Sequence, residues 1–336
     1  MSSLKLRRGP ADGGLLLDAH AETGTAVDIR VPAYEIKGPS ALAGDRRRFW
    51  ALAFTIARSE FKLKFFGSAL GYLWQVMRPL LLFGVLYVFF VKIFHVDKAT
   101  GEAAKFYGAQ LLGSIVLFTF FSEATTGAVR SVVERESLVR KIQFPRLAIP
   151  ISIVLLACFN LGLNLLVVMI FALISGVRPM LSWLELPLIV ALVAVLATGV
   201  AMLLSALFVR FRDIQPIWEV VSQILFYSSP VIIPVEKVRE ALIHGQRHVV
   251  VRDGVTHITF KHVAFYHFLY HLYTLNPLVT VFQQFRHAMI NHATVSAGQA
   301  LGSWAALVEP VALVAVIFAL GFFVFNRDAR AIAENL

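Results

Sequence analysis

Thirty-one consecutive residues without a charged side chain lie between Arg146 and Arg178. A helix needs about 20 residues to cross the roughly 30 Å hydrocarbon core of a bilayer. The run is therefore more than long enough for one crossing, and no soluble core requires a helix so long and so apolar. We interpret the chain as an all-α integral membrane protein.

Composition supports a membrane protein. Of the 336 residues, 58% are hydrophobic and 15% are charged, with a mean hydropathy of +0.72, outside the usual range of soluble domains. The net charge of +10 fits Lys and Arg collecting in cytoplasmic loops, so we expect no nucleic-acid partner. The one cysteine, Cys158, excludes an intrachain disulfide. No cleavable signal peptide is expected in the first thirty residues.

The hydropathy pattern predicts six transmembrane helices, at 72–94, 107–127, 147–175, 184–208, 215–234 and 305–325. The N-terminal segment as far as Lys64 carries eleven Lys and Arg residues, and the 128–146 loop adds five. Basic residues collect on the cytoplasmic side of a membrane. Both termini and the 128–146 loop are therefore predicted to be cytoplasmic.

The segments outside the spans differ in composition. Residues 1–43 are rich in Gly, Ala, Asp and Pro, which predicts a flexible cytoplasmic tail. Residues 44–66 predict a basic amphipathic helix, lying in the membrane interface or packed on a partner protein, and the two placements are compatible. The six-span region follows at 67–330, with a short cytoplasmic tail at 331–336. The basic side chains of the amphipathic helix are Arg47, Arg48, Arg58 and Lys62.

The region at 236–292 is predicted to lie on the extracytoplasmic side of the membrane and to have structure of its own. His248–Arg252 and Val255–Phe260 flank an Asp-Gly pair, which favours a tight hairpin turn. Two short apolar helices follow, at 264–275 and 278–292. Both are too short to span, so we expect them to be re-entrant or interfacial.

Few residues point to catalysis or ligand binding. The phosphate-binding pattern G-x-x-x-x-G-K-[ST] is absent, so the chain is not expected to bind ATP by that loop. His267 and His271 have a spacing that suits a metal on a helix, yet carboxylates are sparse around them and we predict no metal site. The 133–142 segment predicts a short charged helix, either a solvated connector or a docking element for a soluble partner.

Polar and aromatic residues in or near the spans are candidates for a pathway or gate. Ionisable groups inside a membrane indicate function by default, whereas Asn160 and Asn164 also suit hydrogen bonds between helices. The aromatic residues of the outer half suit either an interfacial belt or a surface along which sugar rings slide. The candidates are Tyr72, Trp74, Arg78, Asn160, Asn164, Glu219, Gln223, Phe226, Tyr227, Tyr266, Tyr270 and Tyr273.

Several short motifs occur in a characteristic order. They are Arg58–Lys64, Gly67–Trp74, Arg78–Leu80, Leu138–Ile142, Phe144–Arg146, Phe211–Ile214, Ser229–Ile232 and Leu275–Leu278. Over 44–330 this order resembles the membrane subunits of type-2 ABC exporters, in particular those that export O-antigen, teichoic acid and other cell-surface polysaccharides. The tail at 1–43 and the hairpin at 244–262 are longer than is usual in that family.

The resemblance implies a permease subunit of the bacterial inner membrane that works as a homodimer with two copies of a separate ABC ATPase. ATP and Mg would bind to that ATPase, and this chain would hold no cofactor and would not be an enzyme by itself. The substrate implied is a lipid-linked polysaccharide that passes from the cytoplasm through a pore at the dimer interface. The ATPase-docking residues implied are Glu134, Arg135, Glu136, Leu138, Arg140 and Lys141.

Three alternatives remain open at this stage. A type-2 ABC permease for a lipid or a drug would have the same spans. A stand-alone transporter is expected to show inverted repeats, and none is detected. A glycan ligase would act without an ATPase and would need an outward-facing acid or base, for which Glu240 and Asp253 are the available residues.

Overall fold

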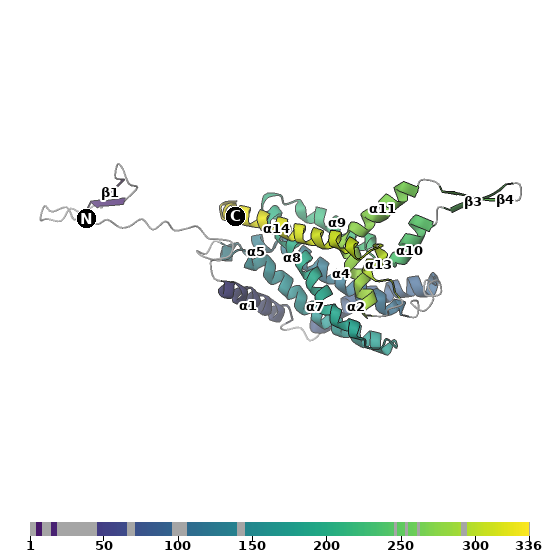
Figure 1. Ribbon diagram of the computed structural model, residues 1–336. Helices are drawn as coiled ribbons and strands as arrows, with labels where there is room; N and C mark the ends of the chain where they lie inside the picture. Colours follow the sequence, from purple (N-terminus) through teal and green to yellow (C-terminus); the bar gives the residue numbers. More distant parts are fainter. Residues whose placement is uncertain are drawn as a thin grey trace. The chain divides into compact units, whose positions relative to one another are not determined.

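The structure is a computed structural model, and its largest part is a helical bundle (Figure 1). The chain divides into two units, Met1–Gly38 and Pro39–Leu336. In the first unit, strands β1 (Lys5–Arg8) and β2 (Leu15–Asp18) pair antiparallel; the rest of the predicted flexible tail lies outside the described residues. The residues described are 5–8, 15–18, 46–65, 71–95, 106–139, 145–244, 247–252, 255–260, 263–289 and 294–335.

Five helical segments of the described chain are long and apolar enough to cross a membrane: Leu73–Ile93, Tyr107–Val129, Ala148–Ile174, Leu181–Arg210 and Ala305–Asp328. They match the first, second, third, fourth and sixth predicted spans within a few residues. They comprise α2 (Gly71–Tyr87) with η1 (Val88–Ile93), α4 (Tyr107–Val129), α7 (Ala148–Ile174), η3 (Leu181–Glu185) with α8 (Leu186–Arg210), and η5 (Ala305–Leu307) with α14 (Val308–Asn335).

The helix in the predicted fifth span is shorter than predicted, although the segment runs from Arg130 at one end of α4 to Tyr107 at the other. Helix α9 (Ile214–Ser228) has 15 residues and reaches about 22 Å, short of the roughly 30 Å hydrocarbon core. Proline has no N–H to continue a helix, and Pro230 lies two residues beyond the end of α9, with Pro234 four residues further on. The helix therefore ends in a turn, and the chain continues beyond Pro234 in two short elements, α10 (Val235–Arg239) and η4 (Glu240–His244).

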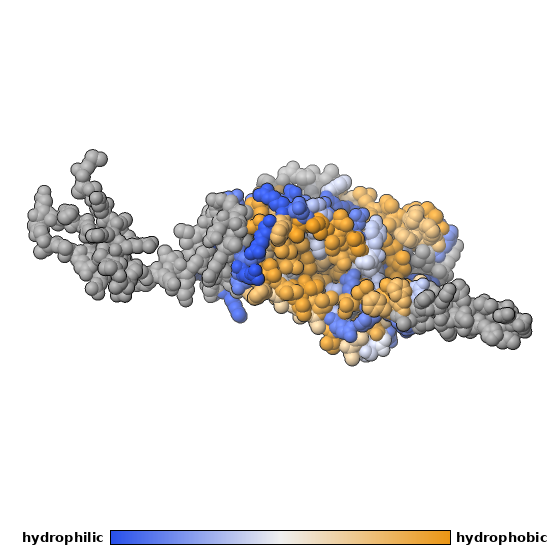
Figure 2. Space-filling view, turned by 90° about the horizontal axis from the view of Figure 1, so that it is seen from above, coloured by the Kyte–Doolittle hydropathy of each residue, from blue (hydrophilic) through white to orange (hydrophobic). Residues whose placement is uncertain are grey.

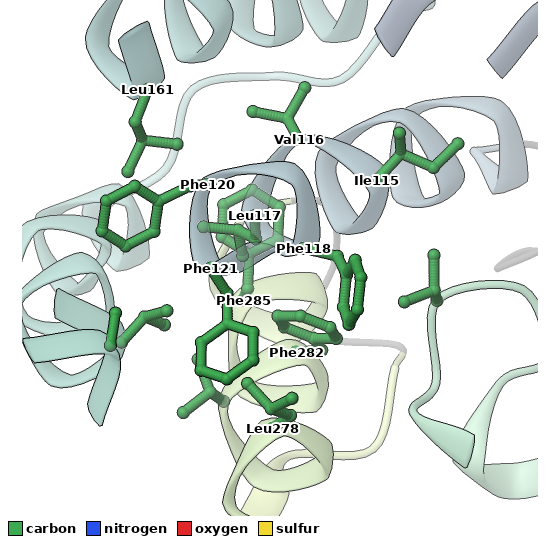
Figure 3. Close-up of a cluster of buried hydrophobic side chains, with 14 of the residues drawn as sticks. Ile115, Val116, Leu117, Phe118, Phe120, Phe121, Leu161, Leu278, Phe282 and Phe285 are labelled. Atoms are coloured by element: carbon green, nitrogen blue, oxygen red, sulfur yellow. The ribbon is translucent and has the colours of Figure 1, made fainter. Parts of the chain in front are cut away.

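Helix α4 is the centre of the bundle. Of its apolar window, 72% is buried, against 17% for the α2 and α14 windows. It contacts α2, α7, α8, α9 and the short helix α12 (Pro277–Met289). Figure 3 shows Phe282 and Phe285 of α12 packed beside the phenylalanines of α4. Phe285 lies so close to Gly113 of α4 that a Cβ there would stand 2.4 Å from the ring.

The predicted hairpin and the two predicted short helices are present. Strands β3 (Arg247–Arg252) and β4 (Val255–Phe260) pair antiparallel with Arg252 opposite Val255. Helix α11 (Val263–Leu275) leaves Phe265, Phe268 and Leu272 exposed, whereas α12 is buried along nearly its whole length. Each helix has 13 residues, too few to span a bilayer.

Both ends of the buried helix α12 are satisfied by side chains. Asn276 accepts a hydrogen bond from the Leu278 N–H at 3.0 Å, and Pro277, the first helical residue, has no N–H to satisfy. At the other end the Ser182 hydroxyl and the Trp183 indole donate to the carbonyls of Ala288 and Met289. A helix end away from water requires such partners, so these contacts allow α12 to stop inside the bundle.

The surface of the bundle fits a membrane protein. Figure 2 shows hydrophobic side chains over the middle of the visible face, with hydrophilic side chains gathered toward its ends. Exposed large apolar residues occur on α2, α7, α8, α9 and α14. The chain is a multi-pass membrane protein, as its hydropathy predicts.

Helices α8 and α14 make the most extensive helix contact of the described chain. Their backbones approach so closely that a Cβ on Gly321 would lie 2.1 Å from the Gly199 carbonyl oxygen. Small residues allow such close packing in a bilayer, where dispersion forces hold helices together. The last span is therefore attached to the bundle through this glycine crossing.

We expect Gly321→Ala to destabilise the purified protein by about 1–3 kcal/mol, because the added methyl group overpacks the crossing. The matched control is Gly162→Ala on α7, where a Cβ meets nothing within 4 Å and the substitution stabilises a helix by about 0.5–1 kcal/mol. Thermal unfolding in detergent measures both. A Gly321→Ala melting temperature at or above that of the wild type would contradict the close crossing.

Candidate functional site

Helices α2 and α9 both contact α4 and both present an uncovered face. On α2 the exposed residues include Trp74, Arg78 and Val85, which share one side of the helix. An exposed cation on an otherwise apolar helix face is costly in lipid. The face of α2 therefore suits a polar pathway or a protein partner better than it suits lipid alone.

Helix α9 has the same character with the opposite charge. Ile217, Val220, Ile224 and Tyr227 are more than half exposed, and Glu219 is exposed beside them. Gln223, one turn after Glu219, is also exposed. The two neighbours of α4 thus each show an open apolar face with one ionisable side chain, Arg78 on α2 and Glu219 on α9.

A layer of polar side chains on α4 holds the surrounding helices. The carboxylate of Glu123 accepts hydrogen bonds from the Gln75 amide of α2 at 2.9 Å and the Asn160 amide of α7 at 3.0 Å. Within the next residues of α4, Thr125 accepts from the Trp218 indole of α9 at 3.2 Å. Glu123 and Thr125 therefore link α2, α7 and α9 at one level of the bundle.

The two predicted asparagines are both buried. Asn160 takes part in the Glu123 network, which agrees with the interpretation as a hydrogen bond between helices. The Oδ1 atoms of Asn160 and Asn164 have no partner among the described residues. Gln75 was not singled out from the sequence, although an amide one turn before Arg78 in an apolar span is the signal that would have identified it.

The predicted aromatic residues fall into two groups. Tyr227 is 68% exposed, while Phe226 packs edge-to-face on Phe118 of α4. Tyr270 donates to the Ala300 carbonyl at 2.7 Å, and Tyr273 lies beside it with its hydroxyl buried. Burial raises the pKa of both phenols. Tyr266 is half-buried on α11, and the side chain of Tyr72 lies outside the description.

The predicted amphipathic helix is α1 (Arg46–Phe65), and it packs along α7. Phe49, Ala53 and Ala57 are buried on one side of it. The predicted basic residues lie on the other side and are all exposed. The apolar side read from the sequence is buried at Phe49 and Ala53, whereas Leu63, which the same pattern places on that side, is exposed.

The predicted charged helix at 133–142 is two single turns, α5 (Ser131–Glu134) and α6 (Glu136–Val139), with Arg135 between them. The Arg135 guanidinium forms an ion pair with Glu60 of α1. Burial lowers the pKa of Arg135. Glu134 is exposed and Glu136 is half-buried, and of the other predicted docking residues the Leu138 side chain, Arg140 and Lys141 lie outside the description.

A second polar contact runs from this loop to α9. Arg130, which follows the last residue of α4, donates to the side-chain oxygen of Gln215 in the first turn of α9. Gln215 in turn donates to Glu219 at 3.0 Å. The loop that carries α5 and α6 is thereby connected to both α1 and α9, and through Gln215 to the candidate residue Glu219.

No group of three His, Cys, Asp or Glu side chains suited to a metal ion occurs in the part of the chain that the structure describes. His271, one of the two predicted metal-type histidines, has its Nε2 atom 3.7 Å from the Glu309 carboxylate. Both side chains are more than half exposed.

Residues 51–247 match the family model described as ABC-2 type transporter. The chain therefore belongs to the ABC-2 type transporter family, a family of membrane permease domains, as its motifs predict. It is 27% identical over 182 residues to the O-antigen export system permease protein RfbA of Klebsiella pneumoniae, covering 54% of this chain and 68% of the relative. The RfbA protein of Myxococcus xanthus is 23% identical over 193 residues, or 57% and 72% of the two chains.

We expect Glu123→Leu to destabilise the bundle, because the Gln75 and Asn160 amides both lose their acceptor. Each buried unsatisfied donor costs about 1–3 kcal/mol. Glu123→Gln, which keeps one acceptor oxygen, should lie between the variant and the wild type. Unfolding of the purified proteins by SDS titration measures the order of their stabilities. Equal stability of the wild type and both variants would show that the hydrogen bonds of Glu123 do not stabilise the bundle.

Proposed function

We propose that this chain is the transmembrane subunit of an ATP-driven exporter of a lipid-linked cell-surface polysaccharide. The observation that carries the proposal is the family match together with relatives named as O-antigen export permeases. We place the protein in the bacterial inner membrane with both termini cytoplasmic. ATP and Mg bind to a separate ABC ATPase, two copies of which join two copies of this chain.

The open faces of α2 and α9 support a pore between two copies of the chain. A two-fold interface uses the same surface on both subunits, and these faces lie on two neighbours of α4 that each expose an ionisable side chain, Arg78 or Glu219. Pairing two copies there would cover apolar side chains such as Val220 and Tyr227. It would also surround Arg78 and Glu219 with protein or water instead of lipid, which removes the cost of exposing them.

The loop at α5 and α6 suits the docking of the ATPase. A displacement of this loop reaches α1 through Arg135 and Glu60, and reaches α9 through Arg130 and Gln215. Since a ligand shifts a conformational balance only by its differential affinity, closure of the ATPase subunits must favour the arrangement in which the two α9 helices part. The polysaccharide then passes outward between them.

The substrate class is tested in the native bacterium by deleting the gene and restoring it. An exporter of polysaccharide predicts loss of the surface glycan and accumulation of the same glycan on its lipid carrier inside the cell. A permease for a drug or a lipid would leave both unchanged and alter drug tolerance or lipid composition instead. A glycan ligase would leave the unjoined glycan on the outer side of the membrane.

Docking is tested by purification of the tagged chain from its own cells. We expect an ABC ATPase to copurify in a one-to-one ratio with the wild type, and Glu134→Lys to reduce its recovery more than tenfold by reversing an exposed charge on α5. Glu240→Lys, an exposed carboxylate outside α5 and α6, is the matched control and should retain the ATPase. Full recovery of the ATPase with Glu134→Lys would show that the ATPase docks elsewhere on the chain. Absence of an ATPase with the wild type would overturn the proposal that the chain is part of an ABC exporter.

The dimer seam is tested by cysteine crosslinking in a Cys158→Ser background. Near a two-fold axis a residue meets its own copy, so Val220→Cys should give a covalent dimer with a short bifunctional maleimide in native membranes. Val316→Cys on α14 has similar exposure, 51% against 58% for Val220, and should remain monomeric. Crosslinking at Val316 alone would place the seam on α14.

A further inference from the structure

An open apolar groove lies between the start of α1 and the bundle. It has a volume of about 360 Å³. Three elements each contribute two residues spaced four apart, Leu147 and Ile151 at the start of α7, Thr198 and Met202 of α8, and Phe318 and Phe322 of α14. Residues four apart lie on one face of a helix, one turn from each other. Each of the three helices therefore lines the groove with about one turn of one face.

The first turns of helix α1 line the remaining side of the groove and contribute its charged residue. Phe49 and Trp50 line it, with Phe49 buried and Trp50 54% exposed. Arg46 is its one charged lining residue, and the exposed Arg47 and Arg48 follow it in the helix. The groove thus combines an apolar interior with a cationic mouth.

We propose that this groove is a binding site for an anionic phospholipid, with one acyl chain in the groove and the phosphate at Arg46. A mainly apolar space of this size in a membrane loses dispersion contacts when empty and offers water few polar partners, so a hydrocarbon chain is its natural occupant. Charge complementarity selects the headgroup, because basic side chains at a membrane surface attract anionic lipids. The site is separate from the α2 and α9 faces and does not depend on what the exporter carries.

The bound lipid joins α1 to the last span. Residues of α1, α7, α8 and α14 line the groove and would all contact the same acyl chain, whereas the direct packing of α1 on the bundle is mainly with α7. A phospholipid in the groove therefore stabilises α1 against the bundle at the same helix whose Glu60 pairs with Arg135.

The test uses the fluorescence of Trp50, which lines the groove. The full-length protein is placed in vesicles containing bromine-labelled phosphatidylglycerol or, separately, bromine-labelled phosphatidylcholine at the same mole fraction. The part of the quenching that is lost in Trp50→Phe belongs to Trp50. We expect the quenching of Trp50 to reach half its maximum at a mole fraction of the anionic lipid about fivefold lower than that of phosphatidylcholine. This ratio corresponds to about 1 kcal/mol, the contribution of one basic side chain at the membrane surface.

Two variants and a matched control separate the site from general lipid contact. Arg46→Gln should remove the preference for the anionic lipid, and Arg58→Gln, an exposed basic residue farther along α1, should retain it. Thr198→Phe should fill the groove and reduce quenching by both lipids without lowering the melting temperature. Equal quenching by the two lipids in the wild type, or equal effects of Arg46→Gln and Arg58→Gln, would overturn the proposal. If Trp50 is quenched only after residues 1–40 are deleted, the N-terminal segment of the chain, and not a lipid, occupies the groove in the full-length protein.

Discussion

The carboxylate of Glu123 is the interaction on which the arrangement of the bundle depends. A half-buried carboxylate in a membrane-spanning helix has little water to solvate it, so its hydrogen-bond donors come largely from protein. The donors are Gln75 and Asn160, on two different helices. Because α2 is otherwise little buried, this contact fixes where the first span meets α4, and so decides which face of α2 remains open.

The same requirement for backbone and side-chain partners explains the buried helix α12. It stops inside the bundle because Asn276 caps its start and Ser182 and Trp183 bind its last carbonyls. Its fully buried Arg286 donates to the Val231 carbonyl in the turn after α9. Tyr107 of α4 donates to the neighbouring Ile232 carbonyl. The turn after α9 is thus held by polar contacts from α4 and from α12. Phe282 and Phe285 of α12 pack in the apolar core beside these contacts.

Hydropathy and period predicted much of this fold, because the bilayer admits few alternatives. Five spans, the amphipathic face of α1, the Asp-Gly hairpin and the two short helices follow from apolar length, helical period and turn chemistry. The length of the fifth helix was overpredicted because residues 215–234 are apolar enough to cross, whereas Pro230, Pro234 and the hydrogen bonds to the Val231 and Ile232 carbonyls decide where the helix ends. The pairing of Arg135 with Glu60 and of Glu123 with Gln75 was not predictable, since each joins residues far apart in sequence through packing that composition does not encode.

The short helix α9 has a consequence for how the loop and the open face are related. Helix α9 ends after 15 residues and is held by polar contacts at four levels. These are Gln215 to Arg130 at its start, Trp218 to Thr125 in its second turn, Ser222 to Ser122 one turn later, and the turn after Ser228, which is held by Tyr107 and Arg286. The first contact leads to the loop of α5 and α6, and the other three lead to α4 and α12. A shift of the loop therefore acts first on Gln215, which contacts both Arg130 and Glu219, because Trp218 in the second turn and the end of α9 are attached to α4 and α12.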